Sequence, residues 1–115
     1  MKNPEMKQQE IWYANLDPIK GREQSGVRPV VIVSGNNLNG HSNLKIVCPI
    51  TSQIKKYTGS LFLQKDSTNK LTTDSEVLVF QIRTIDEIRL IKKTGMITRS
   101  QMERLRLYLD EILTY

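Results

Sequence analysis

Cysteine and histidine each occur once in this chain of 115 residues, as Cys48 and His41. A lone cysteine cannot form an internal disulfide, which is typical of a reducing compartment, so we expect a cytoplasmic protein. No cluster of histidine, cysteine or carboxylate residues has the spacing of metal ligands. One histidine in a loop rich in Asn, Gly and Ser is also a weak basis for a Ser-His-Asp site. We therefore expect no metal and no other cofactor, an exposed His41 and a buried, inert Cys48.

Long apolar runs do not occur either. No segment is apolar enough to cross a membrane or to form a secretory leader, so we expect no membrane partner. Hydrophobic residues make up 38% of the chain, which is enough for one core, and the length fits one domain. Residues 1–8 are polar and include Pro4. We expect a flexible N-terminal segment there and a single domain over residues 9–115.

Positive charge is in excess. The chain has 17 Lys and Arg against 12 Asp and Glu, for a formal net charge of +5 and a pI of about 9.5. This balance favours an anionic partner, such as a nucleic acid or an acidic protein segment. The net charge alone does not distinguish the two.

Alternating and β-branched segments predict a sheet of short strands. The expected strands are Glu10–Leu16, Pro29–Val33, Leu44–Ile50, Ser60–Gln64 and Glu76–Arg83. Residues 90–93 and 95–97 predict a last short strand or an irregular return. Residues 34–43 predict a loop with room for one short helical turn.

The end of the chain predicts a helix. Thr98 and Gln101 have the spacing of a capping box. Apolar residues then recur on one face with a helical period, and we expect that face to be core: Met102, Leu105, Leu109, Ile112 and Leu113. Leu107 lies off this stripe and is a candidate for a second contact surface. The pattern favours a mainly β fold, a small and strongly bent antiparallel sheet or SH3-like barrel closed by a C-terminal helix.

The segment Asp17–Pro29 differs from an ordinary turn. Hairpin connections usually take about 2–5 residues, and this one is longer and more charged. Its two glycines permit positive φ and close approach of a ligand. It carries one internal carboxylate, Glu23, among three cations: Lys20, Arg22 and Arg28. An acid beside fixed cations favours acid–base chemistry on an anionic substrate, and a solvated surface loop is the alternative.

A cation and two hydroxyls are expected at one end of the sheet. Arg28 begins the second predicted strand, and Thr51 and Ser52 end the third. If those strands are neighbours, the three side chains meet and can bind a phosphate and stabilise charge on its oxygens. Phosphodiester cleavage without a metal is easy only where the substrate supplies its own nucleophile, as RNA does through its 2′-hydroxyl. The alternative is an ordinary turn pair and a surface ion-pair partner.

Taken together, five segments resemble the MazF/PemK family of toxins from bacterial toxin–antitoxin modules. The matching segments are Ile11-Trp12, Asp17-Pro18, Gly21-x-Glu23-Gln24-x-Gly26-x-Arg28-Pro29, Pro49-Ile50-Thr51-Ser52 and Gln81-Ile82-Arg83-Thr84-Ile85-Asp86. The resemblance implies a β-barrel with a C-terminal helix, a homodimer, and a metal-independent endoribonuclease (an mRNA interferase) specific for a short sequence in single-stranded RNA. Attack by the 2′-oxygen would leave a 2′,3′-cyclic phosphate and a 5′-hydroxyl.

The resemblance also assigns roles to residues. Arg28 would bind the phosphate and protonate or polarise it, Thr51 would hold a phosphate oxygen, and Glu23 is a candidate base. The remaining residues expected to contact RNA are Lys20, Arg22, Gln24, Ser52, Lys55 and Lys56. The expected partner is a cognate antitoxin, whose acidic, disordered C-terminal segment would fold across the cationic RNA groove.

One position departs from the family pattern. Many relatives carry an acid just before the residue that matches Gln81, and this chain has Phe80 there. A packed core aromatic is the expectation for Phe80, and stacking on a base is the alternative. Arg83 and Asp86 are expected to brace the loops or the dimer, as is Gln81.

Two other functions share this architecture. One is a non-enzymatic poison of DNA gyrase, which needs no Arg/Thr pair and uses the end of its C-terminal helix. The other is an RNA-binding barrel that has lost activity, for which Phe80 is the only hint. The presence of Arg28 and Thr51 favours the ribonuclease.

Overall fold

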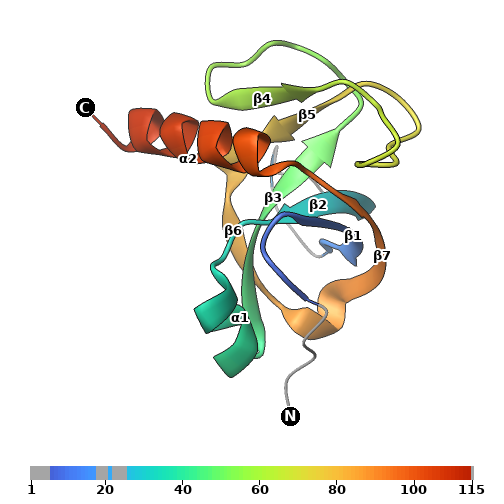
Figure 1. Cartoon of the computed structure of the whole chain (residues 1–115), viewed down its shortest axis with the longest axis vertical. Helices are drawn as coiled ribbons and strands as arrows, with labels where there is room; N and C mark the ends of the chain where they lie inside the picture. Colours follow the sequence, from blue (N-terminus) through green and yellow to red (C-terminus); the bar gives the residue numbers. More distant parts are fainter. Residues whose placement is uncertain (1–5, 18–20, 22–25, 115) are drawn as a thin grey trace.

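The computed structural model describes residues 6–17, 21 and 26–114. In chain order the elements are β1 (Glu10–Asn15), β2 (Val27–Ile32), α1 (Asn36–His41), β3 (Leu44–Thr51), β4 (Ser60–Leu63), β5 (Ser75–Leu78), the 3₁₀ turn η1 (Val79–Gln81), β6 (Arg83–Asp86), the 3₁₀ turn η2 (Glu87–Arg89), β7 (Leu90–Met96) and α2 (Arg99–Leu113). Figure 1 shows the strands as one strongly bent sheet, with α2 lying across one of its faces.

The sheet has seven strands, all paired antiparallel. Its order is β4-β5-β3-β2-β1-β7, and β6 pairs with β3. The bend brings the two ends of this order together, because Met96 of β7 donates its N–H to the carbonyl of Thr68, in the loop after β4, at 3.1 Å. The expected fold class, a small bent antiparallel sheet with a C-terminal helix, is confirmed.

The predicted strand Glu76–Arg83 is wrong in one respect, because it is two strands separated by η1. On the same edge of β3, Ile50 pairs with Val77 and Val47 pairs with Arg83. Between these two pairs β3 covers three residues, from 47 to 50, while its partner segment covers six, from 77 to 83. The extra residues form η1, and the chain bends there.

The other predicted elements are confirmed with small shifts at their ends. β2 begins before the predicted Pro29, and residues 90–96 form one continuous strand rather than two short pieces. The loop between β2 and β3 contains α1, a helix of six residues.

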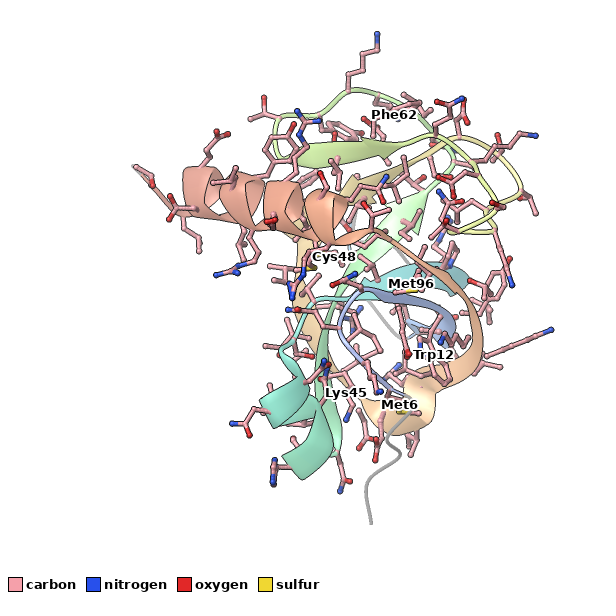
Figure 2. The ribbon with its side chains drawn as sticks, viewed as in Figure 1. Met6, Trp12, Lys45, Cys48, Phe62 and Met96 are labelled. Carbon is pink, nitrogen blue, oxygen red and sulfur yellow. The ribbon has the colours of Figure 1, made fainter. Side chains whose placement is uncertain are left out.

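Two apolar clusters fill the two sides of the sheet. The larger lies between the sheet and α2 and includes Ile11, Val31 and Cys48 with Met102 and Leu105 of α2. Figure 2 shows Cys48 among the side chains beneath α2. The smaller lies inside the curl of the strands, around Trp12 and Val30 among others.

The expected core stripe of α2 is correct for four of its five residues. Met102 and Leu105 are buried, and Leu109 and Ile112 are half-buried against the same cluster. The prediction is wrong for Leu113, which is 77% exposed because the last turn of α2 extends beyond the sheet (Figure 1). Leu107, expected off the stripe, is also exposed.

The start of α2 has the predicted capping box. Thr98 Oγ1 accepts the N–H of Gln101 at 3.1 Å, and Gln101 Oε1 accepts the N–H of Thr98 at 2.8 Å. These reciprocal bonds satisfy two backbone donors that the helix itself leaves without partners.

Replacing Thr98 by alanine is expected to lower the free energy of unfolding by about 1 kcal/mol, because the cap bond is lost. Urea titration monitored by circular dichroism measures this change. Thr98→Ser is the matched control, since it keeps the hydroxyl and should remain close to the wild type. Equal midpoints for the alanine and serine variants would show that the box adds nothing to stability.

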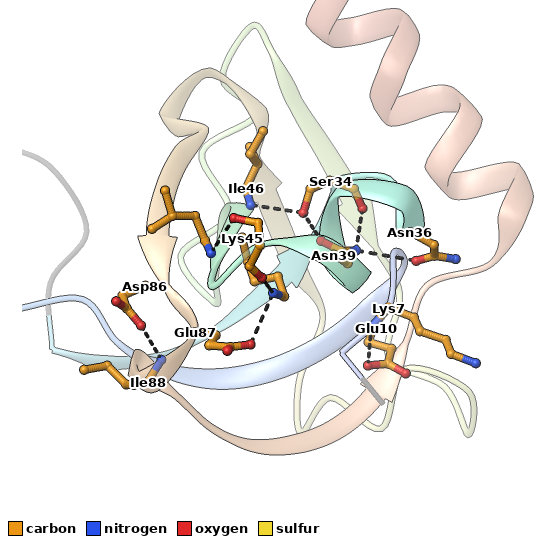
Figure 3. A network of polar contacts seen from close by, with 12 residues as sticks. Lys7, Glu10, Ser34, Asn36, Asn39, Lys45, Ile46, Asp86, Glu87 and Ile88 are labelled. Carbon is orange, nitrogen blue, oxygen red and sulfur yellow. Dashed lines mark hydrogen bonds and ion pairs between the residues drawn. The ribbon is translucent and has the colours of Figure 1, made fainter. Parts of the chain in front are cut away.

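Among the described residues two buried charged groups, Lys45 and Glu10, form ion pairs, and Figure 3 shows the pair of Lys45 with Glu87. Lys45 is fully buried, and its Nζ donates to the carbonyl of Ser42 at 2.7 Å and to Glu87 Oε2 at 3.2 Å. The buried carboxylate of Glu10 pairs with Lys93 and accepts the indole N–H of Trp12 at 3.0 Å. Such groups are tolerated in a core because they are paired and hydrogen-bonded.

Part of the N-terminal segment expected to be flexible contacts the sheet. Met6 packs against the smaller cluster, and Gln8 donates its N–H to Asn36 Oδ1 at 2.7 Å and its side-chain amide to the carbonyl of Val33 at 2.9 Å. Residues 1–5 lie outside the described part of the chain.

Candidate functional site

The ends of the charged loop between β1 and β2 are tied together at its base. Asp17 Oδ1 accepts the N–H of Gly26 at 2.8 Å, and Leu16 donates its N–H to the carbonyl of Gly26 at 2.9 Å. Gly26 has φ +76°, which favours glycine. Four predicted site residues of this loop lie outside the described residues: Lys20, Arg22, Glu23 and Gln24.

Two arginines support this loop base from a distant part of the chain. Arg83 donates to the carbonyl of Leu16 at 3.5 Å. Arg89 donates to the carbonyl of Asn15 at 3.1 Å and also to that of Asp17. Asp86 accepts the N–H of Ile88 at 3.0 Å and so caps η2. The predicted bracing roles of Arg83 and Asp86 agree with these contacts.

Arg28 and Thr51 lie on neighbouring strands at the same end of the sheet. In the β2–β3 pair, Val30 lies opposite Pro49. Continuing this register by two residues in each strand brings Arg28 level with Thr51. The ladder itself ends at Val30 and Pro49, so Arg28 and Thr51 lie just beyond the same end of it. The prediction that the two strands are neighbours is therefore confirmed.

Thr51 is the buried member of this pair. The residue is 5% exposed, and its Oγ1 accepts the N–H of Gln53 at 3.1 Å. A hydroxyl that accepts one hydrogen bond still carries its own proton. Thr51 can therefore donate to a phosphate oxygen while it remains fixed by Gln53.

Sequence reasoning did not predict Glu76, which lies directly opposite Thr51 in the β3–β5 pair. Its carboxylate is buried and accepts the N–H of Lys55 at 2.8 Å, the N–H of Lys56 at 3.0 Å and the hydroxyl of Ser60 at 2.9 Å. The available signal was a carboxylate within an otherwise apolar strand, where an acid needs partners. Glu76 thus fixes the backbone of the loop over residues 52–59, which follows Thr51.

Two residues of that loop that were predicted to contact RNA lie at the protein surface. Lys55 and Lys56 are exposed while their backbone N–H groups are bound by Glu76. Gly59, with φ +81°, packs so closely on α2 that a Cβ would lie 2.9 Å from Ile112 Cγ2. The loop is therefore tied to the sheet at one point and to the helix at another.

Phe80 is not the packed core aromatic that we expected. It is 41% exposed, and its ring meets the ring of Tyr57 edge to face with centroids 5.5 Å apart. The cause is η1, which replaces strand geometry at residues 79–81 and places Phe80 against the loop, where its N–H reaches the carbonyl of Gly59 at 3.3 Å.

Two hollows flank this end of the sheet. The larger, of about 530 Å³, lies against the 52–59 loop and contains Lys56, Glu76 and the aromatic rings of Tyr57, Phe62 and Tyr108. Figure 2 shows Phe62 on the outer side of β4. The smaller, of about 200 Å³, is lined by Arg28 and Ser52 together with Lys70. The predicted residues Arg28 and Ser52 are thus brought together, while Lys56 faces the other hollow.

The lone cysteine and histidine lie elsewhere, as expected. Burial raises the pKa of the Cys48 thiol from 9.0 to about 12, so the thiol stays protonated at neutral pH. His41 is exposed at the end of α1, and its Nδ1 lies 2.8 Å from the carbonyl of Asn37. Within the described residues no group of His, Cys, Asp or Glu could hold a metal ion. No helix in this part of the chain is long and apolar enough to cross a bilayer.

The family model for PemK-like, MazF-like toxins of type II toxin–antitoxin systems matches residues 7–113. The chain is 35% identical over 106 residues to Endoribonuclease MazF of Staphylococcus saprophyticus, covering 91% of this chain and 88% of that protein. The crystal structure of MazF from Deinococcus radiodurans superposes with a TM-score of 0.80 at 26% identity, covering 93% and 94% of the two chains. A MazE–MazF structure from that organism gives 0.74 at 25% identity, again covering 93% and 94%. The chain belongs to the PemK-like, MazF-like toxin family.

Proposed function

We propose that this chain cleaves single-stranded RNA by attack of a 2′-oxygen on the neighbouring phosphate, with Arg28 and Thr51 holding that phosphate. The observation that supports the proposal is the pairing of β2 with β3, because Arg28 and Thr51 each lie two residues beyond the same end of that ladder. Endoribonuclease activity itself follows from the family, because its curated relative is named Endoribonuclease MazF. The same name favours a ribonuclease over a gyrase poison or an inactive RNA-binding barrel.

The reaction consists of two proton transfers and a build-up of negative charge on the phosphate. The 2′-hydroxyl must lose its proton, the oxygens of the phosphate must be stabilised as charge builds on them, and the 5′-oxygen must receive a proton as its bond to phosphorus breaks. The guanidinium of Arg28 offers two parallel N–H donors to phosphate oxygens, and the Thr51 hydroxyl offers a third. Glu23 is the proposed base, on the strength of the loop motif.

The RNA strand is proposed to follow the loops on either side of this pair. Lys20, Arg22 and Gln24 would contact it from the first loop, and Ser52, Lys55 and Lys56 from the second. Lys55 and Lys56 are exposed on a backbone that Glu76 fixes, which suits contacts with phosphates.

A cognate antitoxin is the proposed protein partner, since the related Deinococcus radiodurans protein has been solved as MazE–MazF. We propose that an acidic, disordered segment of this antitoxin folds over the cationic surface and competes with RNA. A homodimer in the cytoplasm, where mRNA is found, completes the proposal.

The experiment is digestion of a long RNA of mixed sequence with EDTA present, followed by sequencing and chemical analysis of the fragment ends. We expect cleavage at one short sequence, with 2′,3′-cyclic phosphate and 5′-hydroxyl ends. An oligonucleotide of that sequence with a 2′-deoxynucleotide before the scissile bond should remain intact, because its nucleophile is missing. Fragments with 5′-phosphates, or cleavage only when a divalent cation is added, would contradict the mechanism.

A further inference from the structure

The smaller hollow beside Arg28 has the chemistry of an anion site. Two cations line it, Arg28 and Lys70, with hydroxyls from Ser52, Thr72 and Thr73. The described residues around it include no carboxylate. Within that part of the chain Lys70 also has no ion-pair partner, so its charge is not neutralised locally. The general mechanism above uses only Arg28 and Ser52 of this set.

Lys70 is presented by a loop with a dense internal framework. Asn69 is 1% exposed, and its side-chain oxygen accepts the N–H groups of Asp66 and Leu71, both at 3.0 Å. Its amide nitrogen donates to the carbonyl of Gln64 at 2.9 Å. A buried asparagine that satisfies three backbone groups fixes the path of this loop.

Both neighbours of Lys70 in the sequence are anchored. Asn69 is buried on one side, and on the other Leu71 packs against the larger core cluster. Lys70 itself has φ +55°, and its N–H reaches the carbonyl of Asp66 at 2.9 Å. A left-handed lysine costs free energy and persists only where its surroundings impose that conformation, as the framework around Asn69 does here.

The loop is also fixed against β7. A Cβ at Gly95 would collide with the carbonyl oxygens of Thr68 and Asn69, so only glycine allows this close approach. The N–H of Met96 bonds the carbonyl of Thr68 at 3.1 Å. The position of Lys70 relative to the sheet, and hence to Arg28, is therefore built into the fold.

We propose that Lys70, with the hydroxyls of Thr72 and Thr73, binds an RNA backbone phosphate next to the one held by Arg28. This inference rests on the proposed function, because it places a second phosphate of the same strand. Lysine binds phosphate as a point charge, and threonine hydroxyls donate to its oxygens. Because Arg28 and Lys70 line the same hollow, one RNA strand could place neighbouring phosphates on both residues.

An acidic protein segment is the competing occupant. The small volume favours a single compact anion rather than an extended peptide with its side chains. Arg28, the proposed ligand of the scissile phosphate, also lines the same hollow. We therefore assign the hollow to RNA and leave the antitoxin segment as an outcome of the test.

The test compares the salt dependence of RNA cleavage for the wild type, Lys70→Met and Lys65→Met. Each protein–phosphate contact with single-stranded nucleic acid contributes about −0.7 to the slope of log affinity against log salt. We expect Lys70→Met to have a slope of log kcat/KM that is shallower by about 0.7, and a kcat/KM about tenfold lower at low salt. Lys70→Arg keeps the charge and should restore the slope.

Lys65→Met is the matched control because it removes a lysine of the same loop that is exposed and does not line the hollow. Its slope should equal that of the wild type. Methionine at position 70 occupies the same left-handed backbone as lysine, and thermal unfolding of the variants establishes that they remain folded.

Several results would overturn the subsite. One is an unchanged slope for Lys70→Met, and another is equal losses for the two methionine variants. A third is an unchanged RNA slope with weaker inhibition by an acidic antitoxin peptide, which would assign the hollow to the protein partner. If the wild type itself does not cleave RNA, the proposed function fails, which is a different outcome from failure of the subsite.

Discussion

Arg28→Ala is expected to lower kcat/KM for RNA cleavage by roughly 10²–10³-fold, the usual loss when one preorganised donor to a developing oxyanion is removed. Arg28 lies where β2 meets the charged loop, at the same end of the β2–β3 ladder as Thr51. Lys70 lines the same hollow but offers a single ammonium group, so it does not replace the two parallel N–H donors of the guanidinium. Measured initial rates on an oligonucleotide of the preferred sequence give the ratio.

Arg28→Lys separates charge from geometry. Lysine keeps the positive charge and loses the two parallel donors, so we expect an intermediate loss. Thr51→Val tests the second donor, because it removes the hydroxyl and keeps the shape, whereas Thr51→Ser keeps the hydroxyl. Arg99→Ala, on the exposed first turn of α2, is the control for simple loss of charge. A folded Arg28→Ala protein within a few-fold of the wild type would remove Arg28 from the reaction.

The pairing of Arg28 with Thr51 could be predicted from sequence because it depends on local signals. Each strand is recognisable by its own apolar pattern, and strands that follow one another in the chain are usually neighbours in the sheet. Arg28 near the start of one strand and Thr51 at the end of the next are then expected at the same end of the sheet, without any knowledge of the other strands. The capping box of α2 is local in the same sense.

Features that depend on register between distant segments could not be predicted in this way. β5 and β6 pair with the same edge of β3, and the residues between them exceed what β3 spans over that distance. This pairing is what makes residues 79–81 form η1 instead of a strand. Phe80 is exposed for this reason, although its sequence neighbourhood is typical of a core strand. Local periodicity contains no information about such an offset.

The supports of the site are also contacts between distant segments. Glu76 reaches Lys55 and Lys56 across about twenty residues of chain. Arg89 reaches the base of the first loop from β7's side of the molecule, and Gly95 allows the loop that carries Lys70 to approach the sheet. Sequence reasoning therefore found residues proposed to touch the substrate and the bracing residue Arg83, but missed Glu76, Arg89 and Gly95.

Glu76→Ala is expected to lower the free energy of unfolding by about 2–4 kcal/mol, because it removes a buried charged acceptor of three hydrogen bonds. Each bond to a charged group contributes about 1.5–3 kcal/mol, and the expected total is smaller than the sum of three such bonds because water can reach the donors of Lys55 and Lys56 once the loop opens. Urea titration gives this change from the shift in midpoint.

The location of the effect is as informative as its size. Lys55 and Lys56 are themselves trypsin sites within the loop that Glu76 holds, so loss of the carboxylate should speed cleavage after these two residues before global unfolding occurs. Cleavage after Lys65 and Lys70, in the loop organised by Asn69, should keep its wild-type rate. Glu76→Gln retains one acceptor oxygen and the shape of the side chain. Its rate of cleavage after Lys55 and Lys56 should therefore lie between those of the wild type and Glu76→Ala. Trypsin cleavage after Lys55 and Lys56 that is as slow in Glu76→Ala as in the wild type would mean that the loop is held by Gly59 and its contact with α2 instead.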